Sequence, residues 1–270
     1  GLGVSLALGV PLTTGAYAVI RRRPKDWWLV LSAAAVPLAV VAGNLAPVLL
    51  MPIFNRFEPL RDRRRAARVR ALAGKAGVRI ADVYQMDMSR QTEKPNAMFA
   101  GLGATKRIVL ADTLLDRFAD EEIDGIVAHE LGHQVHGDIW RSIVVSGALG
   151  FVSAWLVDRL ATPLVARFGS RYGVRSLGDI ASVPWLGLAL TAVGLVAAPL
   201  AAAYSRAIER RADRYAIDLT GDGAVYAAAL GRLASASLAD PNPPRPVVWM
   251  LYSHPPIAER IAAAQAAVAG

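Results

Sequence analysis

The chain has 270 residues, of which 54% are hydrophobic and only 19% are charged, and its formal net charge is +8. The length fits one large domain or two small ones, and the excess of apolar over charged residues predicts membrane segments. The sequence contains 0 cysteines, which excludes disulfides, thiolate metal ligands and a cysteine nucleophile. Histidine and carboxylate side chains are therefore the expected ligands of any metal site.

Two apolar runs make up the N-terminal part of the chain. Residues 1–20 form an uninterrupted run of about the length that crosses a bilayer, and residues 27–54 form a second candidate span. Residues 16–18 resemble a signal-peptidase site, but no basic stretch precedes the apolar run. A retained membrane helix is therefore the better interpretation, and residues 1–54 are predicted to be N-terminal membrane helices.

Residues 55–140 are predicted to be a soluble catalytic region that mixes helices with a small sheet. Its charged residues 60–76 are typical of a helix that ends near Gly77. Short strands are predicted over residues 78–88, 96–102 and 107–111.

Arginines cluster in this region, directly after the second apolar run. They are Arg56, Arg61, Arg63, Arg64, Arg65, Arg68 and Arg70. No aromatic-interleaved basic surface or nucleic-acid motif accompanies the arginines of residues 61–70 or those of residues 21–23, so contact with anionic lipid is favoured over nucleic-acid binding for both clusters. The bias of lysine and arginine assigns this region to the cytoplasmic side. Residues 21–25, with three arginines and one lysine, would then lie on the opposite side, contrary to the same rule.

The sequence His129-Glu130-Leu131-Gly132-His133 carries the clearest chemical signal. On a helix, two histidines four residues apart lie on one face, so both imidazoles can reach one metal ion. Glu130 would point at a metal-bound water and take its proton, as in the H-E-x-x-H arrangement of zinc peptidases. The chain has 4 histidines, and three of them lie within residues 129–136. This concentration weakens the alternative that they are ordinary core or surface histidines.

The sequence around this motif predicts the helix that the motif requires. Asp120 can cap the helix, and Glu121 and Glu122 lie in its positive first turn. The apolar stripe consists of Ile123, Ile126, Val127 and Leu131.

Residues 141–204 are predicted to be a membrane helical hairpin. Residues 142–160 form a third span that runs straight on from the metal helix, and residues 184–204 form a fourth, with a loop over residues 161–183. Two crossings then separate the H-E-x-x-H motif from the segment that begins at Ser205. Both lie on the same side of the membrane, as a shared metal requires.

Residues 205–270 are predicted to be a C-terminal helical region that completes the zinc site. A catalytic zinc takes three protein ligands and keeps a fourth position for water. Glu209 is the candidate third ligand, and Asp213, one turn later, can accept the remaining ring N–H of a ligand histidine. The spacing alone fits equally well an exposed ion-pair face formed with the neighbouring arginines.

Hydrogen-bond donors are also needed for the negative charge that develops on the substrate carbonyl. His254 and Arg260 are candidates, because two prolines after His254 form a rigid corner before a helix predicted over residues 255–268. The alternative is a helix-capping corner with a surface arginine. A helix over residues 225–238 and a proline-rich link over residues 241–246 precede this corner.

With these residues assembled, the chain resembles the integral-membrane zinc peptidases of the CAAX prenyl protease type 1 family and their smaller relative, the heat-shock protease HtpX. The match covers most of the chain, and separate motifs follow in the family's order. They are residues 52–57, Pro95-Asn96-Ala97, residues 105–115, the H-E-x-x-H motif, Ser205-Arg206 with Glu209 and Asp213, and Ser253-His254-Pro255-Pro256 with Glu259-Arg260.

The resemblance implies roles for the residues that the spacing left open. It implies Glu209 as the third zinc ligand, and His254 and Arg260 as transition-state donors. It also implies that the strand at residues 96–100, with Asn96 and Ala97, is the edge that pairs with an extended substrate. The prenyl proteases have more membrane spans ahead of this point. The four-span layout is closer to HtpX, whereas the motifs of the second span and the strand are closer to the prenyl proteases.

These observations predict a mainly α integral membrane protein with about four transmembrane helices and a zincin-like α+β catalytic portion containing a small sheet. The expected function is that of a zinc-dependent endopeptidase acting on peptides or proteins, membrane-associated ones among them. Zinc is the expected cofactor and the lipid bilayer is an expected partner, whereas nucleic acid is not an expected partner. The expected location is multi-pass in the plasma membrane of a bacterium, with the site on the cytoplasmic side.

Three other functions stay open at this point. The first is an HtpX-like protease for the quality control of membrane proteins. The second is a non-catalytic zinc-binding scaffold, against which Glu130 speaks because a scaffold does not need that carboxylate. The third is a soluble metallopeptidase with buried apolar helices.

Overall fold

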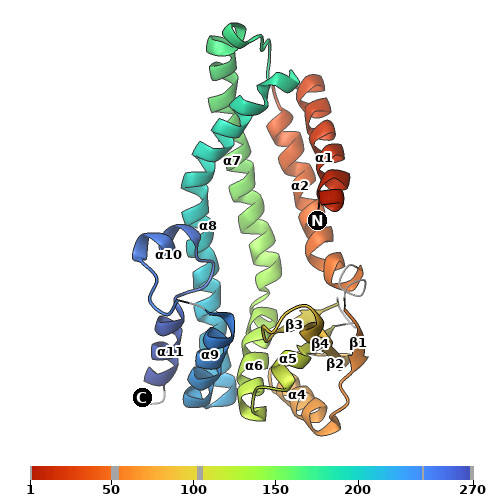
Figure 1. Cartoon of the computed structure of the whole chain (residues 1–270), viewed down its shortest axis with the longest axis vertical. Helices are drawn as coiled ribbons and strands as arrows, with labels where there is room; N and C mark the ends of the chain where they lie inside the picture. The colour runs from red at the N-terminus through yellow and green to blue at the C-terminus, as the bar shows by residue number, and fades with distance from the viewer. Residues whose placement is uncertain (1, 50–54, 102–105, 239, 268–270) are drawn as a thin grey trace. The chain divides into compact units, whose positions relative to one another are not determined.

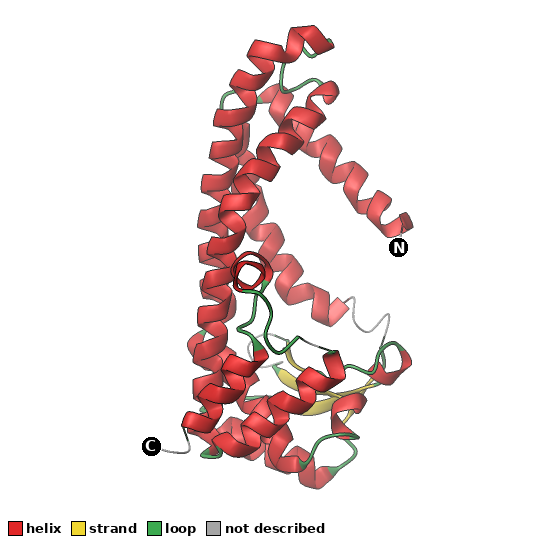
Figure 2. Cartoon of the chain, turned by 60° about the vertical axis from the view of Figure 1, so that its left-hand side comes forward, coloured by secondary structure: helices red, strands yellow, loops and turns green. Residues whose placement is uncertain are grey.

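The computed structural model describes residues 2–49, 55–101, 106–238 and 240–267, which are mainly helical with one small mixed sheet (Figure 1). The chain divides into two compact units. We call Gly1–Val40 with Ser142–Ala201 the helical unit, and Val41–Arg141 with Ala202–Gly270 the mixed unit. The strands of the described residues all lie in the mixed unit (Figure 2).

The helical unit is built from long apolar helices. They are α1 (Leu2–Arg22), most of α2 (Trp27–Leu49), most of α7 (Asp138–Phe168) and the first half of α8 (Val183–Thr220). Buried residues such as Ile20, Val157 and Ala161 form its core, and the indole N–H of Trp27 donates to the buried carboxylate of Asp158 at 2.8 Å.

The prediction of four membrane spans is confirmed in part. Helices form at all four predicted places, but residues 50–54 of the second span lie outside the described part of the chain. Among the described residues, Asp138–Tyr172 and Ile180–Thr220 are long and apolar enough to cross a membrane, whereas Trp27–Val41 is a shorter apolar helix. Spanning by α1 and α2 stays a prediction.

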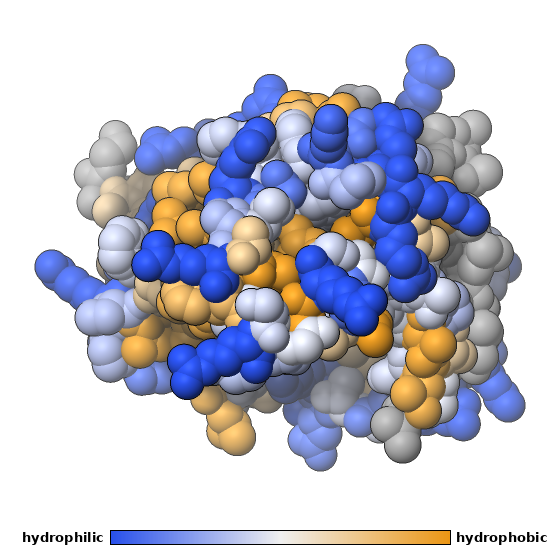
Figure 3. Space-filling model, turned by 90° about the horizontal axis from the view of Figure 1, so that it is seen from above, coloured by the Kyte–Doolittle hydropathy of each residue, from blue (hydrophilic) through white to orange (hydrophobic). Residues whose placement is uncertain are grey.

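The connection between α7 and α8 is more ordered than the predicted loop over residues 161–183. Helix α7 continues to Phe168, and 3₁₀ turns at Gly169–Tyr172 and Ile180–Ser182 follow. Three arginines of this connection are exposed, namely Arg167, Arg171 and Arg175. Figure 3 looks onto this end of the protein and shows hydrophilic side chains projecting around hydrophobic ones.

The sheet of the mixed unit has the order β1-β2-β4-β3. Its strands are β1 (Phe57–Pro59), β2 (Asp82–Met86), β3 (Ala97–Ala100) and β4 (Arg107–Ala111). β2 and β4 are parallel, and the two outer strands pair antiparallel to them. β4 is buried on both faces, as expected for a central strand with an unbroken apolar run. The three predicted strands are confirmed, β4 with the predicted bounds and β2 and β3 in shorter form. β3 is an edge strand, as the resemblance implied.

Helix α4 (Arg63–Lys75) confirms the predicted charged helix but begins three residues later. It begins there because the Asp62 carboxylate accepts hydrogen bonds from two backbone N–H groups of the first turn. The chain leaves the helix at Gly77, whose φ of +69° suits glycine.

Part of the arginine cluster fastens α4 to α6 (Asp120–His136). Arg65 donates to Asp120 at 2.7 Å and Arg68 donates to Asp124 at 2.6 Å. These half-buried ion pairs occupy two of the arginines that the sequence assigned to lipid contact. Arg65 and Arg68 therefore have a role within the fold, and lipid contact by the cluster stays a prediction.

The C-terminal part of the mixed unit consists of the second half of α8 and the helices that follow it in the described residues. Those following helices are α9 (Gly223–Ser237), α10 (Arg245–Leu251) and α11 (Ile257–Ala266). α11 packs on α9, and α9 packs on α6. The predicted proline-rich link is shorter than residues 241–246, because Pro246 lies in the first turn of α10, where proline is tolerated.

Candidate metal centre

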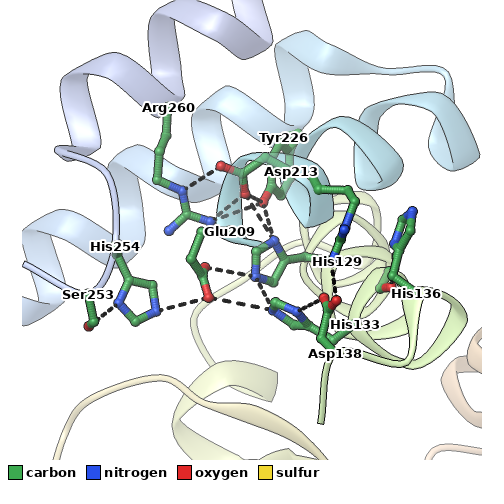
Figure 4. Close-up of polar contacts among 12 residues, drawn as sticks. His129, His133, His136, Asp138, Glu209, Asp213, Tyr226, Ser253, His254 and Arg260 are labelled. Atoms are coloured by element: carbon green, nitrogen blue, oxygen red, sulfur yellow. Dashed lines mark hydrogen bonds and ion pairs between the residues drawn. The ribbon is translucent and has the colours of Figure 1, made fainter. Parts of the chain in front are cut away.

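The two histidines of the H-E-x-x-H motif face one another on α6. Their Nε2 atoms are 3.2 Å apart, and the rings are perpendicular (Figure 4). The helix begins differently from the prediction, since Asp120 does not cap it. Instead the Glu122 carboxylate accepts a hydrogen bond from the Ala119 N–H at 2.8 Å, while Asp120 pairs with Arg65.

Glu209 reaches the same point from α8. Its carboxylate oxygens lie 3.3 Å from Nε2 of His129 and 3.6 Å from Nε2 of His133. Close approach of α8 to α6 depends on Gly132, where an added Cβ would lie 3.2 Å from the backbone of Ala212 and from the side chain of Tyr215. The missing side chain at Gly132 therefore lets α8 come close enough to α6 for Glu209, the third potential ligand, to reach the two histidines.

The donor set fits a metal ion. Among the described residues, potential ligand atoms of His129, His133 and Glu209 all lie within 4.8 Å of one another. Three ligands at ~2.1 Å from one tetrahedral zinc would be ~3.4 Å apart, close to the three separations given above. In addition, Oε2 of Glu209 is buried and receives no hydrogen bond, which a bound cation would remedy.

Carboxylates hold the other ring nitrogen of both histidines. Nδ1 of His129 lies 3.0 Å from Asp213, and Nδ1 of His133 lies 2.9 Å from Asp138. Each Nδ1 can therefore donate its hydrogen to a carboxylate and leave the Nε2 lone pair for a metal. Although burial opposes a charged imidazole, the neighbouring carboxylates of Asp213 and Glu209 raise the pKa of His129 to about 9. The site thus attracts positive charge.

Asp213 is the centre of a buried network. It accepts hydrogen bonds from the Tyr226 hydroxyl at 2.7 Å and from two nitrogens of Arg260 at 2.6 and 2.8 Å. The Tyr226 hydroxyl also lies 3.1 Å from Nδ1 of His129. Burial and the neighbouring carboxylate raise the pKa of Tyr226, so its hydroxyl remains a neutral donor. The network thus fixes the orientation of the His129 ring through Nδ1, the nitrogen that faces away from the proposed metal position.

Glu130 lies in a cavity of about 190 Å³ beside the metal ligands. Burial raises the pKa of its carboxyl above the ordinary value. His254 and Arg260 line the same cavity, and so do Asn96, directly before β3, and Ala97, its first residue. Its apolar wall is formed by Leu114 in α5 (Asp112–Leu115), Ile126 in α6, and Leu230 and Leu233 in α9. The site residues that the sequence suggested therefore lie in this cavity, in the ligand group beside it, or in the network around Asp213.

His254 approaches the cavity from an exposed turn. Its Nε2 lies 3.5 Å from Oε1 of Glu209, and its Nδ1 lies 2.9 Å from the Ser253 hydroxyl. His136 is placed differently, because its Nδ1 lies 2.7 Å from the carbonyl oxygen of Gly132 and its ring packs on Tyr215. His136 therefore belongs to the packing of α6 and not to the ligand group.

Sequence reasoning missed Asp138 and Tyr226. The predicted third span continued straight from α6, but the helix ends at Gly137, whose φ is +64°. Asp138 then starts α7, turns its buried side chain back to His133 and also accepts from Arg211. A glycine followed by aspartate after a histidine-rich turn is a helix stop and start signal that could have revealed this break. No local signal marks Tyr226.

Comparison with known proteins agrees with this geometry. The chain is 32% identical over 245 residues to "Uncharacterized metalloprotease YhfN" of Bacillus subtilis, covering 91% of this chain and 58% of the relative. It is 29% identical over 270 residues to a CAAX prenyl protease 1 homolog of Arabidopsis thaliana, covering 97% and 62%. A Protease HtpX homolog of Ralstonia pickettii is 32% identical over 167 residues, which is 61% of this chain and 54% of the relative.

A solved structure has the same fold. The crystal structure of S. mikatae Ste24p superposes with a TM-score of 0.84 at 26% identity, covering 97% of this chain and 64% of that one. The chain thus spans about three fifths of the length of most of these relatives. The sequence profile described as Peptidase family M48 matches residues 59–268. The chain belongs to peptidase family M48.

Proposed function

We propose that the protein is a membrane-embedded zinc-dependent endopeptidase. The observation that carries the proposal is the convergence of His129, His133 and Glu209 on one point, with the Glu130 carboxyl in the adjoining cavity. Membership of a metallopeptidase family supports a metal at this point, and the two-histidine, one-glutamate donor set is typical of catalytic zinc.

Zinc held by these three ligands would lower the pKa of a water molecule to about 7 and polarise the scissile carbonyl. Glu130 accepts the proton of the attacking water and delivers it to the leaving amine nitrogen. His254 and Arg260 donate hydrogen bonds to the carbonyl oxygen as it gains negative charge. Asp213 and Asp138 hold the two imidazoles in the orientation that keeps each Nε2 directed at the site.

The substrate is an extended peptide that pairs with the edge of β3. Strand β3 pairs with β4 on one side, and its first residue Ala97 and the preceding Asn96 line the cavity that holds Glu130. Backbone pairing at a sheet edge binds an extended chain without requiring a particular sequence. The apolar wall formed by Ile126, Leu230 and Leu233 favours an aliphatic side chain next to the scissile bond.

The mechanism is tested by Glu130→Gln, which removes the base but no metal ligand. Hydrolysis of a fluorogenic peptide should fall by roughly 10²–10⁴-fold while the bound metal stays at the parent level. Glu121→Gln is the matched control, because Glu121 is an exposed carboxylate in the first turn of the same helix. Cleavage by Glu130→Gln at the parent rate would refute the proposed base, and a metal-loaded parent without turnover would favour a zinc-binding scaffold.

Removal of the C-terminal residues of CAAX proteins is the more specific proposal. It is favoured because the similarity to a CAAX prenyl protease 1 homolog and to Ste24p covers 97% of the chain. An HtpX-like quality-control protease is the alternative, with shorter coverage. Cleavage of a farnesylated CAAX peptide well above its unprenylated form supports the first, and preference for an unfolded membrane protein supports the second.

The proposed location is multi-pass in the plasma membrane of a bacterium, with four spans and the metal site on the cytoplasmic side. The two helices α7 and α8 and the arginines after the second apolar run support it. Because the chain has 0 cysteines, single cysteines can be introduced and labelled from either side of intact cells. Labelling of a cysteine in α4 from outside would contradict the cytoplasmic assignment.

A further inference from the structure

Helix α10 carries large apolar side chains that the described part of the chain leaves uncovered. None of its 7 residues is buried. Trp249 is 62% exposed and Leu251 is 75% exposed. Packing within the described part of the mixed unit does not cover Trp249 and Leu251, so these two side chains need another environment.

Hydrogen bonds from Arg206 determine the position of α10 along α8. The side chain of Arg206 is buried, and one guanidinium nitrogen donates to the carbonyl oxygens of Val248 and Tyr252 at 2.9 and 2.8 Å. These carbonyls lie at the C-terminal end of α10, so α10 is fastened to α8 at the level of Arg206. Arg206 follows the apolar run of α8, residues 184–204, by two residues, which is about 3 Å along a helix. Helix α10 is therefore held at the level where α8 becomes polar.

We propose that α10 lies in the interfacial layer of the membrane, with Trp249 and Leu251 in the acyl boundary. The inference rests on the proposed membrane location of α8. At 7 residues, or about 10 Å, α10 is too short to span the bilayer, so contact with the membrane puts it at the surface. Tryptophan is the side chain enriched at this depth, and Arg245 at the start of the helix suits anionic head groups.

The position of α10 also ties the membrane surface to the metal centre. Tyr252, whose carbonyl Arg206 holds, is followed after one residue by His254, and His254 reaches Glu209 at 3.5 Å. A lipid surface that holds α10 in position therefore also restrains the turn that carries His254. Because His254 lines the substrate cavity and lies three residues after α10, this arrangement also brings the cavity close to the head groups, where a membrane-associated substrate would be encountered.

Spin labels on single cysteines test the depth of α10, because the parent has 0 cysteines. Trp249→Cys and Leu251→Cys are labelled separately in the full chain, reconstituted in vesicles of phosphatidylcholine with phosphatidylglycerol. Collision rates with oxygen, which concentrates in lipid, are compared with those of a water-soluble nickel complex. Val144→Cys in α7, at 70% exposure, serves as the lipid reference, and Asp218→Cys, exposed on α8, serves as the aqueous reference.

The ratio of oxygen to nickel collisions at both α10 positions is expected to exceed that at position 218 several-fold and to approach that at position 144. A nickel-accessible α10 with a lipid-exposed position 144 would overturn the inference while leaving the membrane location intact. Shielding of both α10 positions from both reagents would overturn it too, because α10 would then be covered by protein. A nickel-accessible position 144 would overturn the inference together with the membrane location.

Discussion

Asp213→Asn is expected to weaken metal binding by about 10–100-fold, which corresponds to about 1.4–2.8 kcal/mol. The reason is that the carboxylate 3.0 Å from Nδ1 of His129 sets the ring orientation and makes Nε2 a better donor to a metal. Asparagine is similar in size, so the change removes the charge while leaving the packing. The variant also leaves Arg260, which is 12% exposed, without its carboxylate, and this should cost about 3 kcal/mol of folding stability.

The assay is a competition titration of the purified protein with a chromophoric zinc chelator. Asp218→Asn, an exposed aspartate on the same helix, is the matched control and should bind like the parent. Tyr226→Phe removes one hydrogen bond to Asp213 but keeps the charge, so its loss should be smaller than that of Asp213→Asn. Parent-like zinc affinity in folded Asp213→Asn would refute the role assigned to this carboxylate.

Two further predictions follow from packing and from protonation. Gly132→Ala should lower stability by about 1–2 kcal/mol, because the new Cβ meets Ala212 and Tyr215 at 3.2 Å, whereas Gly74→Ala in α4, with nothing within 4 Å, should not. Thermal unfolding of the two variants in one detergent decides this, and equal midpoints would contradict it. A proton on metal-free His129, with a pKa of about 9, competes with the metal, so apparent zinc affinity should rise with pH and level off near pH 9. Affinity independent of pH between about 6 and 9 would show that His129 carries no such proton.

The helices and the first two ligands could be predicted from the sequence, because their signals are local. A spacing of four residues from His129 to His133 puts both imidazoles on one helical face, and an apolar stripe indicates which face is buried. Glu209 could not be predicted from spacing alone, since its position depends on the contact at Gly132, 77 residues earlier in the chain. Only the resemblance to a known family separated a ligand from an exposed ion-pair face.

Elements with weak local signals were missed for physical reasons. Strand β1 has 3 residues and ends in Pro59, so it carries no period-2 pattern, and it forms only because β2 offers backbone partners. Helix α10 was not predicted because the prolines of residues 241–246 indicated a link, although Pro246 fits the first turn of a helix. Asp138 was missed because an apolar span appeared to continue through Gly137, where the chain in fact turns.

The most direct test of the central claim is the zinc content of detergent-purified protein, measured by elemental analysis on the parent and on Glu209→Ala side by side. A Glu259→Ala variant controls for the loss of a carboxylate, because Glu259 is exposed in α11. About one zinc per chain in the parent and in the control, with loss in Glu209→Ala, is the result expected of a site made by His129, His133 and Glu209. Full zinc in Glu209→Ala, or none in a folded parent after reconstitution with zinc, would contradict it.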